Sequence, residues 1–202
     1  MSHITTTRLE ITDFQALIDA LRDNYGEVVE VHATPQVRKV AYNRYEAVHA
    51  YVPETAFASR WGSGIGVRVG ADGRIDLLVD SDDRNAVVPA IRRAYALRVA
   101  DADLTARGFV RAAADETLTD GTVRRVYTPA DGAPAPRVVV IVDPDGTVRI
   151  TVEGVSGMGC LPLTADLIAR LGGAAETTLT ADAYGESADA DPWAWAKERS
   201  NA

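Results

Sequence analysis

Apolar side chains near the N-terminus recur with the period of a helix. Four of them stand at positions i, i+3, i+4 and i+7, on one helical face: Phe14, Leu17, Ile18 and Leu21. Thr12 and Gln15 have the spacing of a capping box, and Gly26 is suited to end the helix. The β-branched stretch 5–11 precedes them, so the chain is predicted to open with a strand and a helix.

Strand patterns follow, and then a second helix. Extended segments are expected at 28–32, 37–52, 65–69 and 74–79, the last two joined in a hairpin at Asp72-Gly73. The apolar period becomes helical from Asn85 to Gly108, with Pro89 expected in the first turn, where a missing N–H costs little. Strands at 109–118 and 122–127 then complete an α+β unit.

Prolines interrupt the chain at residues 128–136, where we expect a linker between two domains. Beyond it, strands at 137–142 and 147–155 enclose the turn sequence Asp143-Pro144-Asp145-Gly146. A helix around Leu167 follows, and 177–184 is a candidate strand. The predicted fold is α+β, with two small antiparallel-sheet units and covering helices joined by a Pro-rich linker. The expected domains are 1–127 and 137–185, followed by an acidic, aromatic tail at 186–202.

Composition narrows the functional classes. The 202 residues carry a net charge of -8, the wrong sign for a protein that binds mainly through phosphates. Most of the excess negative charge lies in residues 129–202. This segment carries 5 of the chain's 21 basic groups and 11 of its 29 acidic groups. One cysteine excludes an intramolecular disulfide framework, and neither a membrane-spanning apolar run nor a secretory signal is seen. We expect a soluble, cytoplasmic protein.

The N-terminal part resembles a known family. The opening Met1-Ser2-His3-Ile4, the strand and helix after it, and the later helix with Tyr95, Gly108 and Phe109 carry this resemblance. It is to the domain-of-unknown-function 1257 family, of the hypothetical chloroplast reading frame 35 type, over residues 1–127. Members tend to have a Trp-bearing stretch where this chain has Asp80-Ser81-Asp82-Asp83.

A second resemblance covers residues 137–185. An Asp-Pro-Asp-Gly hairpin, a glycine-bearing turn, one cysteine and a short helix are similar to the domain-of-unknown-function 2997 family. Proteins of the two families are often encoded near one another and near ATPases of the AAA+ class. The resemblance therefore implies a fusion of two partners and a AAA+ ATPase as a possible partner; it implies no established activity.

Cys160 is the candidate with the most chemical content. Pro162 suits the first turn of a helix, which would place the thiol near a helix N-terminus, where a thiolate is stabilised. The alternative is a small apolar side chain that closes the glycine-rich turn, and burial of this kind is common for free cysteine. A thiol-dependent redox or transfer module centred on Cys160 is therefore the second functional hypothesis.

The other candidate sites favour structural roles. Gly154, Gly157 and Gly159 lie between a strand and a helix, as anion-binding glycines do, but their order fits neither nucleotide fingerprint. Gly62, Gly64 and Gly66 precede a strand and favour turns. The acidic groups are better explained by a hairpin turn (Asp143, Asp145) and by a helix dipole (Asp80, Asp82, Asp83). The three histidines, His3, His32 and His49, lack metal-ligand spacing, so neither metal nor cofactor is expected.

Two clusters suggest binding partners. Arg38, Lys39 and Arg44 alternate with tyrosines, as in single-strand nucleic-acid surfaces, but the solvated face of a strand is the favoured explanation because the net charge disfavours nucleic acid. Trp193 and Trp195 in the polar tail require an apolar partner, either the protein's own sheet or another protein. The leading hypothesis is a non-enzymatic accessory or adaptor protein, and a weak nucleic-acid binder is the third.

Overall fold

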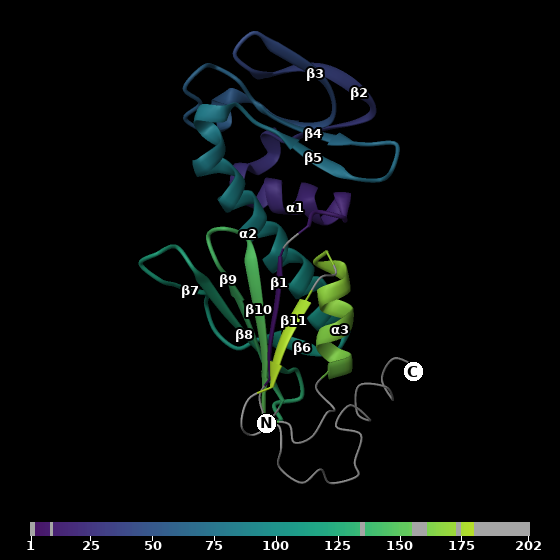
Figure 1. Ribbon diagram of the computed structural model, residues 1–202, viewed down its shortest axis with the longest axis vertical. Coiled ribbons are helices and arrows are strands. Elements are labelled where there is room, and N and C mark those ends of the chain that lie inside the picture. The colour runs from purple at the N-terminus through teal and green to yellow at the C-terminus, as the bar shows by residue number, and fades with distance from the viewer. Residues whose placement is uncertain (1–2, 9, 134–135, 155–160, 173–174, 180–202) are drawn as a thin grey trace. The chain divides into compact units, whose positions relative to one another are not determined.

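The computed structural model describes residues 3–8, 10–133, 136–154, 161–172 and 175–179 (Figure 1). The chain forms two compact units. Unit 1 comprises Met1–Glu10 and Val99–Ala202, and unit 2 comprises Ile11–Arg98. Unit 2 is therefore an insertion between the first strand of unit 1 and the rest of that unit.

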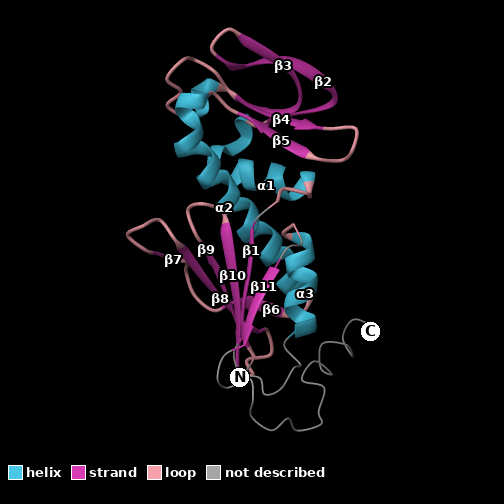
Figure 2. Ribbon diagram, viewed as in Figure 1, coloured by secondary structure: helices cyan, strands magenta, loops and turns pink. Residues whose placement is uncertain are grey.

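Unit 2 is a four-stranded antiparallel meander with helices (Figure 2). Its strands are adjacent in chain order, β2-β3-β4-β5. Its elements are α1 (Phe14–Tyr25), η1 (Gly26–Val28), β2 (Glu30–Ala41), β3 (Arg44–Val52), η2 (Glu54–Ala56), β4 (Ile65–Val69), β5 (Ile75–Leu78) and the first part of α2 (Ser81–Ala106). The predicted first helix and the hairpin at Asp72-Gly73 are both confirmed.

The start of α1 is held by a buried tyrosine. Asp13 is the N-cap and its side chain accepts a hydrogen bond from Ala16 N (3.0 Å), so the cap lies one residue beyond the Thr12 that the sequence suggested. The Tyr95 hydroxyl accepts hydrogen bonds from the backbone N–H groups of Thr12 and Asp13, both at 3.1 Å. Tyr95 is fully buried in α2, so this contact ties the two helices of unit 2 together.

Unit 1 is a seven-stranded antiparallel sheet in the order β11-β1-β10-β9-β8-β6, with β7 paired to β8. Its elements are β1 (His3–Arg8), the last part of α2, β6 (Phe109–Arg111), β7 (Glu116–Thr117), β8 (Val123–Pro129), β9 (Arg137–Val142), β10 (Thr147–Glu153), α3 (Leu161–Arg170) and β11 (Ala175–Leu179).

One face of this sheet carries the core of unit 1. Strands β9 and β10 alternate so that every second residue is inaccessible to solvent: Val138, Val140, Val142, Val148, Ile150 and Val152. Two ion pairs bring the end of α2 beside α3: Asp103 of α2 with Arg170 of α3 (Oδ1–Nη1 3.4 Å), and Arg107, directly after α2, with Asp166 of α3 (Nη2–Oδ2 2.9 Å). Their fully buried side chains include Leu104 of α2 and Leu167 of α3, which supply apolar surface beside that of the sheet.

The connectivity of unit 1 is that of a split βαβ arrangement. Disregarding the insertion of unit 2 and the β6–β8 extension, the order along the chain is β1-α2-β9-β10-α3-β11, a β-α-β-β-α-β pattern of the ferredoxin-like type. Strands β10 and β11 run parallel to each other, and β1 lies between them, antiparallel to both.

The α+β fold class is confirmed, but the chain divides differently from the expected 1–127 and 137–185. Strands β8 and β9 pair directly, with Tyr127 opposite Val138. The proline-rich segment therefore joins two neighbouring strands of one sheet. Proline supplies no hydrogen-bond donor, which suits a strand connection as well as a linker, so composition could not distinguish the two.

Helix α2 also differs from expectation at its start. It begins at Ser81, with Asp82 and Asp83 in the first turn, so Pro89 lies inside the helix. A proline there removes one intrahelical hydrogen bond. None of the helices in the described ranges is long and apolar enough to cross a membrane.

We expect Tyr95→Phe to lower the free energy of unfolding by about 1–3 kcal/mol, because two backbone N–H groups lose a buried acceptor. Denaturant unfolding measures this change. Tyr45→Phe, at an exposed position, is the control and should unfold at the wild-type denaturant concentration. Equal midpoints for both variants would contradict the role given to Tyr95.

Candidate functional site

Three exposed aromatic side chains of unit 2 come from the β2–β3 hairpin and from the loop before β4. Tyr42 lies in the β2–β3 turn, Tyr45 is the second residue of β3, and Trp61 lies in the loop before β4. They are 64%, 63% and 44% exposed. The rings of Tyr42 and Trp61 are 5.5 Å apart between centroids and tilted by 57°. We call Tyr42, Tyr45 and Trp61 the aromatic surface.

The N-terminus of α2 holds two parts of the aromatic surface in place. The indole Nε1 of Trp61 donates to Asp82 Oδ2 (2.7 Å), and the backbone N–H of Tyr42 donates to Asp80 Oδ2 (2.9 Å). The hydrogen bonds that Asp80 accepts from the backbone of Asp82 and Tyr42 lower its pKa below the ordinary value. The ionised carboxylate is thus the form that fits this site.

Asp83 fixes the loop that carries Trp61. It accepts hydrogen bonds from Ser59 Oγ (3.0 Å) and from the backbone N–H of Arg60 (3.3 Å). Asp80, Asp82 and Asp83 therefore lie at the start of α2, as expected for acidic groups that complement the helix dipole. They also anchor a distant turn and loop. No group of three or more His, Cys, Asp or Glu in the described residues could hold a metal ion.

Gly64 in this loop and Gly66 in β4 leave room for neighbouring side chains. A Cβ added to Gly64 would lie 2.2 Å from the ring of Tyr51, and one added to Gly66 would lie 2.7 Å from Val40 Cγ1 and from Val48 Cγ1. Only Gly62, with φ of +58°, has the left-handed conformation of a turn glycine. Two of the three glycines are thus required for close packing.

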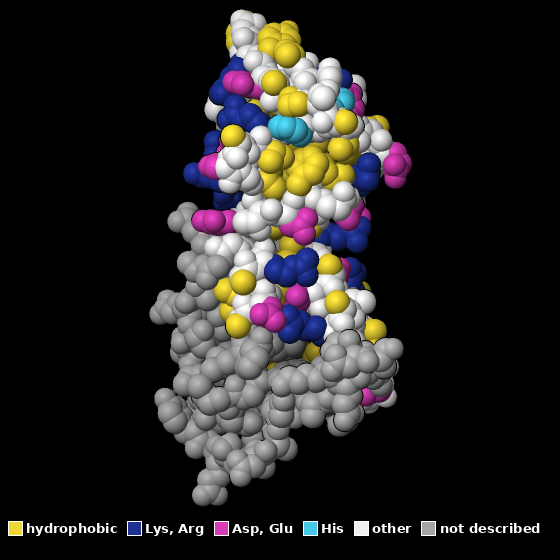
Figure 3. Space-filling view, turned by 90° about the vertical axis from the view of Figure 1, so that its right-hand side faces the viewer, with side chains coloured by type: hydrophobic (Ala, Val, Ile, Leu, Met, Phe, Trp, Pro, Cys, Tyr) yellow, Lys and Arg dark blue, Asp and Glu magenta, His cyan; other side chains and the backbone are white. Residues whose placement is uncertain are grey.

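The predicted basic residues lie close to the aromatic surface but are already paired. Lys39 is opposite Tyr45 across the hairpin, and its Nζ donates to the carbonyl oxygen of Trp61 (2.9 Å). Arg38 and Arg44 each form an ion pair with a glutamate, Glu30 and Glu46 respectively, both at 2.8 Å. Figure 3 likewise shows basic and acidic side chains interspersed on the face it presents.

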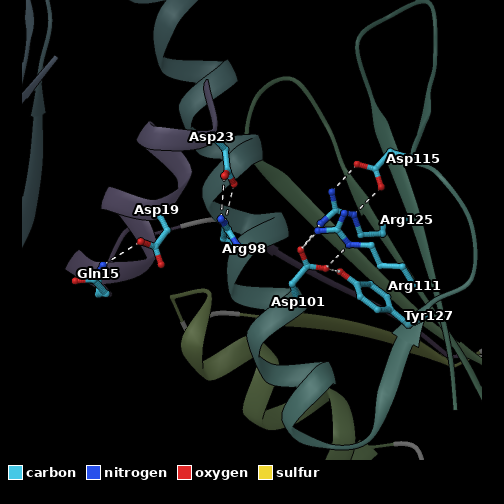
Figure 4. Close-up of polar contacts among 9 residues, drawn as sticks. All are labelled: Gln15, Asp19, Asp23, Arg98, Asp101, Arg111, Asp115, Arg125 and Tyr127. Carbon is cyan, nitrogen blue, oxygen red and sulfur yellow. Dashed lines mark hydrogen bonds and ion pairs between the residues drawn. The ribbon is translucent and has the colours of Figure 1, made fainter. Parts of the chain in front are cut away.

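Unit 1 contains a separate buried polar network, which joins α2, the β6–β7 connection and β8 (Figure 4). Arg125 is only 7% exposed and lies between two carboxylates. Its Nη1 is 2.7 Å from Asp101 Oδ2, and its Nε and Nη2 bind both oxygens of Asp115 at 2.6 and 2.5 Å. Tyr127 donates to Asp101 Oδ1 (2.8 Å), and Arg111 also binds Asp101. We call these five residues the Arg125 network.

Two members of the Arg125 network, Asp101 and Tyr127, have pKa values shifted away from neutral pH. Burial acts to raise the pKa of Asp101, but hydrogen bonds from Arg111 and Tyr127 and the charge of Arg125 hold it below its ordinary value. Burial and the neighbouring Asp101 charge raise the pKa of Tyr127. A general acid or base requires a pKa near the working pH, so these groups are arranged for structure rather than for proton transfer.

Other predicted site residues have structural roles or lie outside the described residues. Gly154 is exposed with φ of +80°, as in a turn. The Asp143–Gly146 turn is confirmed: Asp145 Oδ1 accepts from Thr147 N (2.8 Å), and Gly146 has φ of +88°. Five predicted site residues lie outside the described ranges: Gly157, Gly159, Cys160, Trp193 and Trp195. The predictions made for them stay untested.

Sequence reasoning missed Trp61 and the Arg125 network. The sequence indicated Trp61 only weakly. A tryptophan next to an arginine, Arg60, is unusual in a glycine-rich loop whose only role is to connect two strands. Arg125 and Tyr127 are two positions apart, so they share one face of β8, and the pairing places that face with Val138 and Val140. Nothing in the sequence identifies Asp101 and Asp115 as their partners.

We expect Asp101→Asn to lower the free energy of unfolding at pH 7 by about 2 kcal/mol or more, because a buried guanidinium loses a charged partner. The folded-state pKa of Asp101 lies below 3.8, so its contribution is complete above that pH and is lost as the pH falls through the lower value. The difference from wild type should therefore shrink in denaturant titrations on going from pH 5 to pH 2.

The matched control is Asp23→Asn, which removes an exposed ion pair with Arg98 (2.7 Å) and should cost at most about 1 kcal/mol. A difference between Asp101→Asn and wild type that stays constant down to pH 2 would contradict the assigned ionisation of Asp101.

Comparison with known proteins gives a family match for one part of unit 1. Residues 138–184 match the model of a family described as protein of unknown function, DUF2997. This segment contains β10, α3, β11 and nearly all of β9, and it agrees with the second resemblance seen in the sequence. No curated protein and no solved structure matches the chain. The resemblance of residues 1–127 to the chloroplast reading frame family stays a prediction, and residues 138–184 are similar to a family of unknown function.

Proposed function

We propose that this protein is a non-enzymatic adaptor that binds another protein through the aromatic surface of unit 2. The observation that carries the proposal is the exposed, mutually packed pair Tyr42 and Trp61; Tyr45, which is also exposed, follows in the same hairpin. Tryptophan and tyrosine are the residues that most often dominate the energy of protein interfaces.

The anchoring of the aromatic surface supports a binding role. Trp61 is fixed through its Nε1 by Asp82 and through its carbonyl oxygen by Lys39. Side chains that are already ordered lose less conformational entropy when a partner binds. An aromatic ring held in a solvent-exposed position is therefore better suited to recognition than a freely rotating one.

The electrostatics favour a protein partner over nucleic acid. Arg60 lies over the Trp61 ring (5.5 Å) and pairs with Asp82 (3.5 Å), so it too has a carboxylate beside it. Phosphate binding depends on cations that displace counterions from the nucleic acid, whereas Arg38, Arg44 and Arg60 are each paired with a carboxylate of unit 2. Polar pairs around an aromatic centre are typical of the rim of a protein interface.

The first experiment compares tagged wild type with Tyr42→Ala/Trp61→Ala in the native host and identifies co-purifying proteins by mass spectrometry. A partner captured by wild type should be lost from the double variant, and its Kd, titrated with purified proteins, should rise at least about tenfold. The resemblance to families encoded near AAA+ ATPases makes such an ATPase the first partner to test.

The matched control is Leu118→Ala, which removes a side chain that is also exposed (45%) but lies in unit 1. It should bind as wild type does. Equal capture by all three proteins would contradict the proposal. Trp193→Ala/Trp195→Ala, tested in parallel, asks whether the tail provides a second pair of anchors.

Fluorescence anisotropy with a labelled single-stranded oligonucleotide tests the nucleic-acid alternative. We expect no saturable binding at 150 mM salt. Salt-dependent binding that Arg38→Gln or Arg44→Gln weakens would instead favour the nucleic-acid role.

A further inference from the structure

The family-matching segment does not form a continuous sheet by itself. Residues 138–184 contain β10 and β11, yet these strands are not neighbours. Strand β1, from the other end of the chain, separates them. The segment thus has a position for one strand that it does not supply.

Strand β1 fills this position with backbone pairing on both edges. Residues Ile4 to Arg8 pair with Thr151 to Thr147 of β10, and His3 to Thr7 pair with Leu179 to Ala175 of β11. Without β1, the facing edges of β10 and β11 would be about 10 Å apart, too far for direct pairing. Each edge would then present unpaired N–H and C=O groups, which strongly favour the addition of a strand.

Strand β1 is joined to the rest of unit 1 only through unit 2. Between Glu10 and Val99, the chain leaves unit 1 and forms the whole of unit 2. The sequence of β1, His-Ile-Thr-Thr-Thr-Arg, is rich in β-branched residues, which favour the extended conformation without help from the rest of the chain. The backbone pairing with β10 and β11 is therefore equally available to a strand that is not joined to the rest of the chain.

The end of α3 forms a close contact with Glu10, two residues after the end of β1. The backbone N–H of Glu10 donates to the carbonyl oxygen of Leu171 (2.9 Å). A Cβ added to Gly172 would lie 2.7 Å from Glu10 N and 2.6 Å from Glu10 Cβ. Gly172 therefore allows the strand to leave the sheet close against α3.

We propose that unit 1 is a strand-binding module whose slot between β10 and β11 accepts a short antiparallel β-branched strand from a separate polypeptide. Strand β1 is the occupant in this chain. This interaction uses backbone edges of unit 1 and is independent of the aromatic surface of unit 2.

The test separates β1 from the chain after folding. A specific protease site is inserted between Ile11 and Thr12 of the full-length protein, and the folded protein is cleaved there. The cleaved protein is then unfolded, the released N-terminal fragment is removed by gel filtration in denaturant, and the remainder is refolded with an excess of a fluorescently labelled peptide of residues 1–11. We expect one labelled peptide bound per chain after gel filtration, with recovery of the melting transition of the uncut protein.

Two matched comparisons address specificity. A peptide with Thr5→Pro and Thr7→Pro should not bind, because proline removes backbone donors that a central strand needs. Gly172→Ala in the cleaved protein should weaken binding of the unmodified peptide about tenfold. Gly132→Ala is the control, since Gly132 also has positive φ (+80°) but has no atom within 4 Å of an added Cβ.

The proposal is overturned if the remainder refolds to the uncut melting temperature without peptide, because the slot would then need no strand. It is also overturned if the uncut protein refolds under these conditions but the cleaved protein neither binds the labelled peptide nor refolds with it. Equal binding of the proline peptide would likewise exclude insertion as a strand.

Discussion

The central position of β1 is the constraint on which the architecture of unit 1 depends. A strand in the middle of a sheet must satisfy its backbone groups on both edges, and β1 does so only when β10 and β11 flank it. This arrangement joins the first residues of the chain to the last described strand. Unit 2 is consequently an insertion, although it lies in the N-terminal half of the sequence.

The two units use charged side chains in different ways. In unit 1, the Arg125 network is buried, and its carboxylates bind a guanidinium that has little access to water. Breaking such a pair is costly because the remaining charge cannot be solvated. In unit 2, Asp80, Asp82 and Asp83 lie at a helix N-terminus and fix the hairpin turn and the loop that carry the aromatic surface. The first arrangement stabilises a fold, and the second positions exposed rings.

Several residues were predictable because their signals are local. The helical period from Phe14 to Leu21, the turn at Asp72-Gly73 and the Asp143–Gly146 turn all depend on neighbours within a few positions. The candidate site was predictable only in part. Tyr42, Tyr45 and Lys39 attracted attention through their spacing, but Trp61 reaches them from a loop about twenty residues later in the chain, and only the folded backbone brings them together.

The sequence by itself therefore determined the α+β class, the type of most elements and the hairpin turns, because periodicity and turn chemistry act over short distances along the chain. The tertiary structure alone decided which strands are neighbours, and it made the proline-rich segment the end of β8 and its connection to the neighbouring strand β9. It also decided that Arg125 faces the core and that Arg38 and Arg44 are paired with glutamates. These facts depend on long-range strand pairing, in which many alternatives satisfy the same local pattern and only the packed sheet selects one.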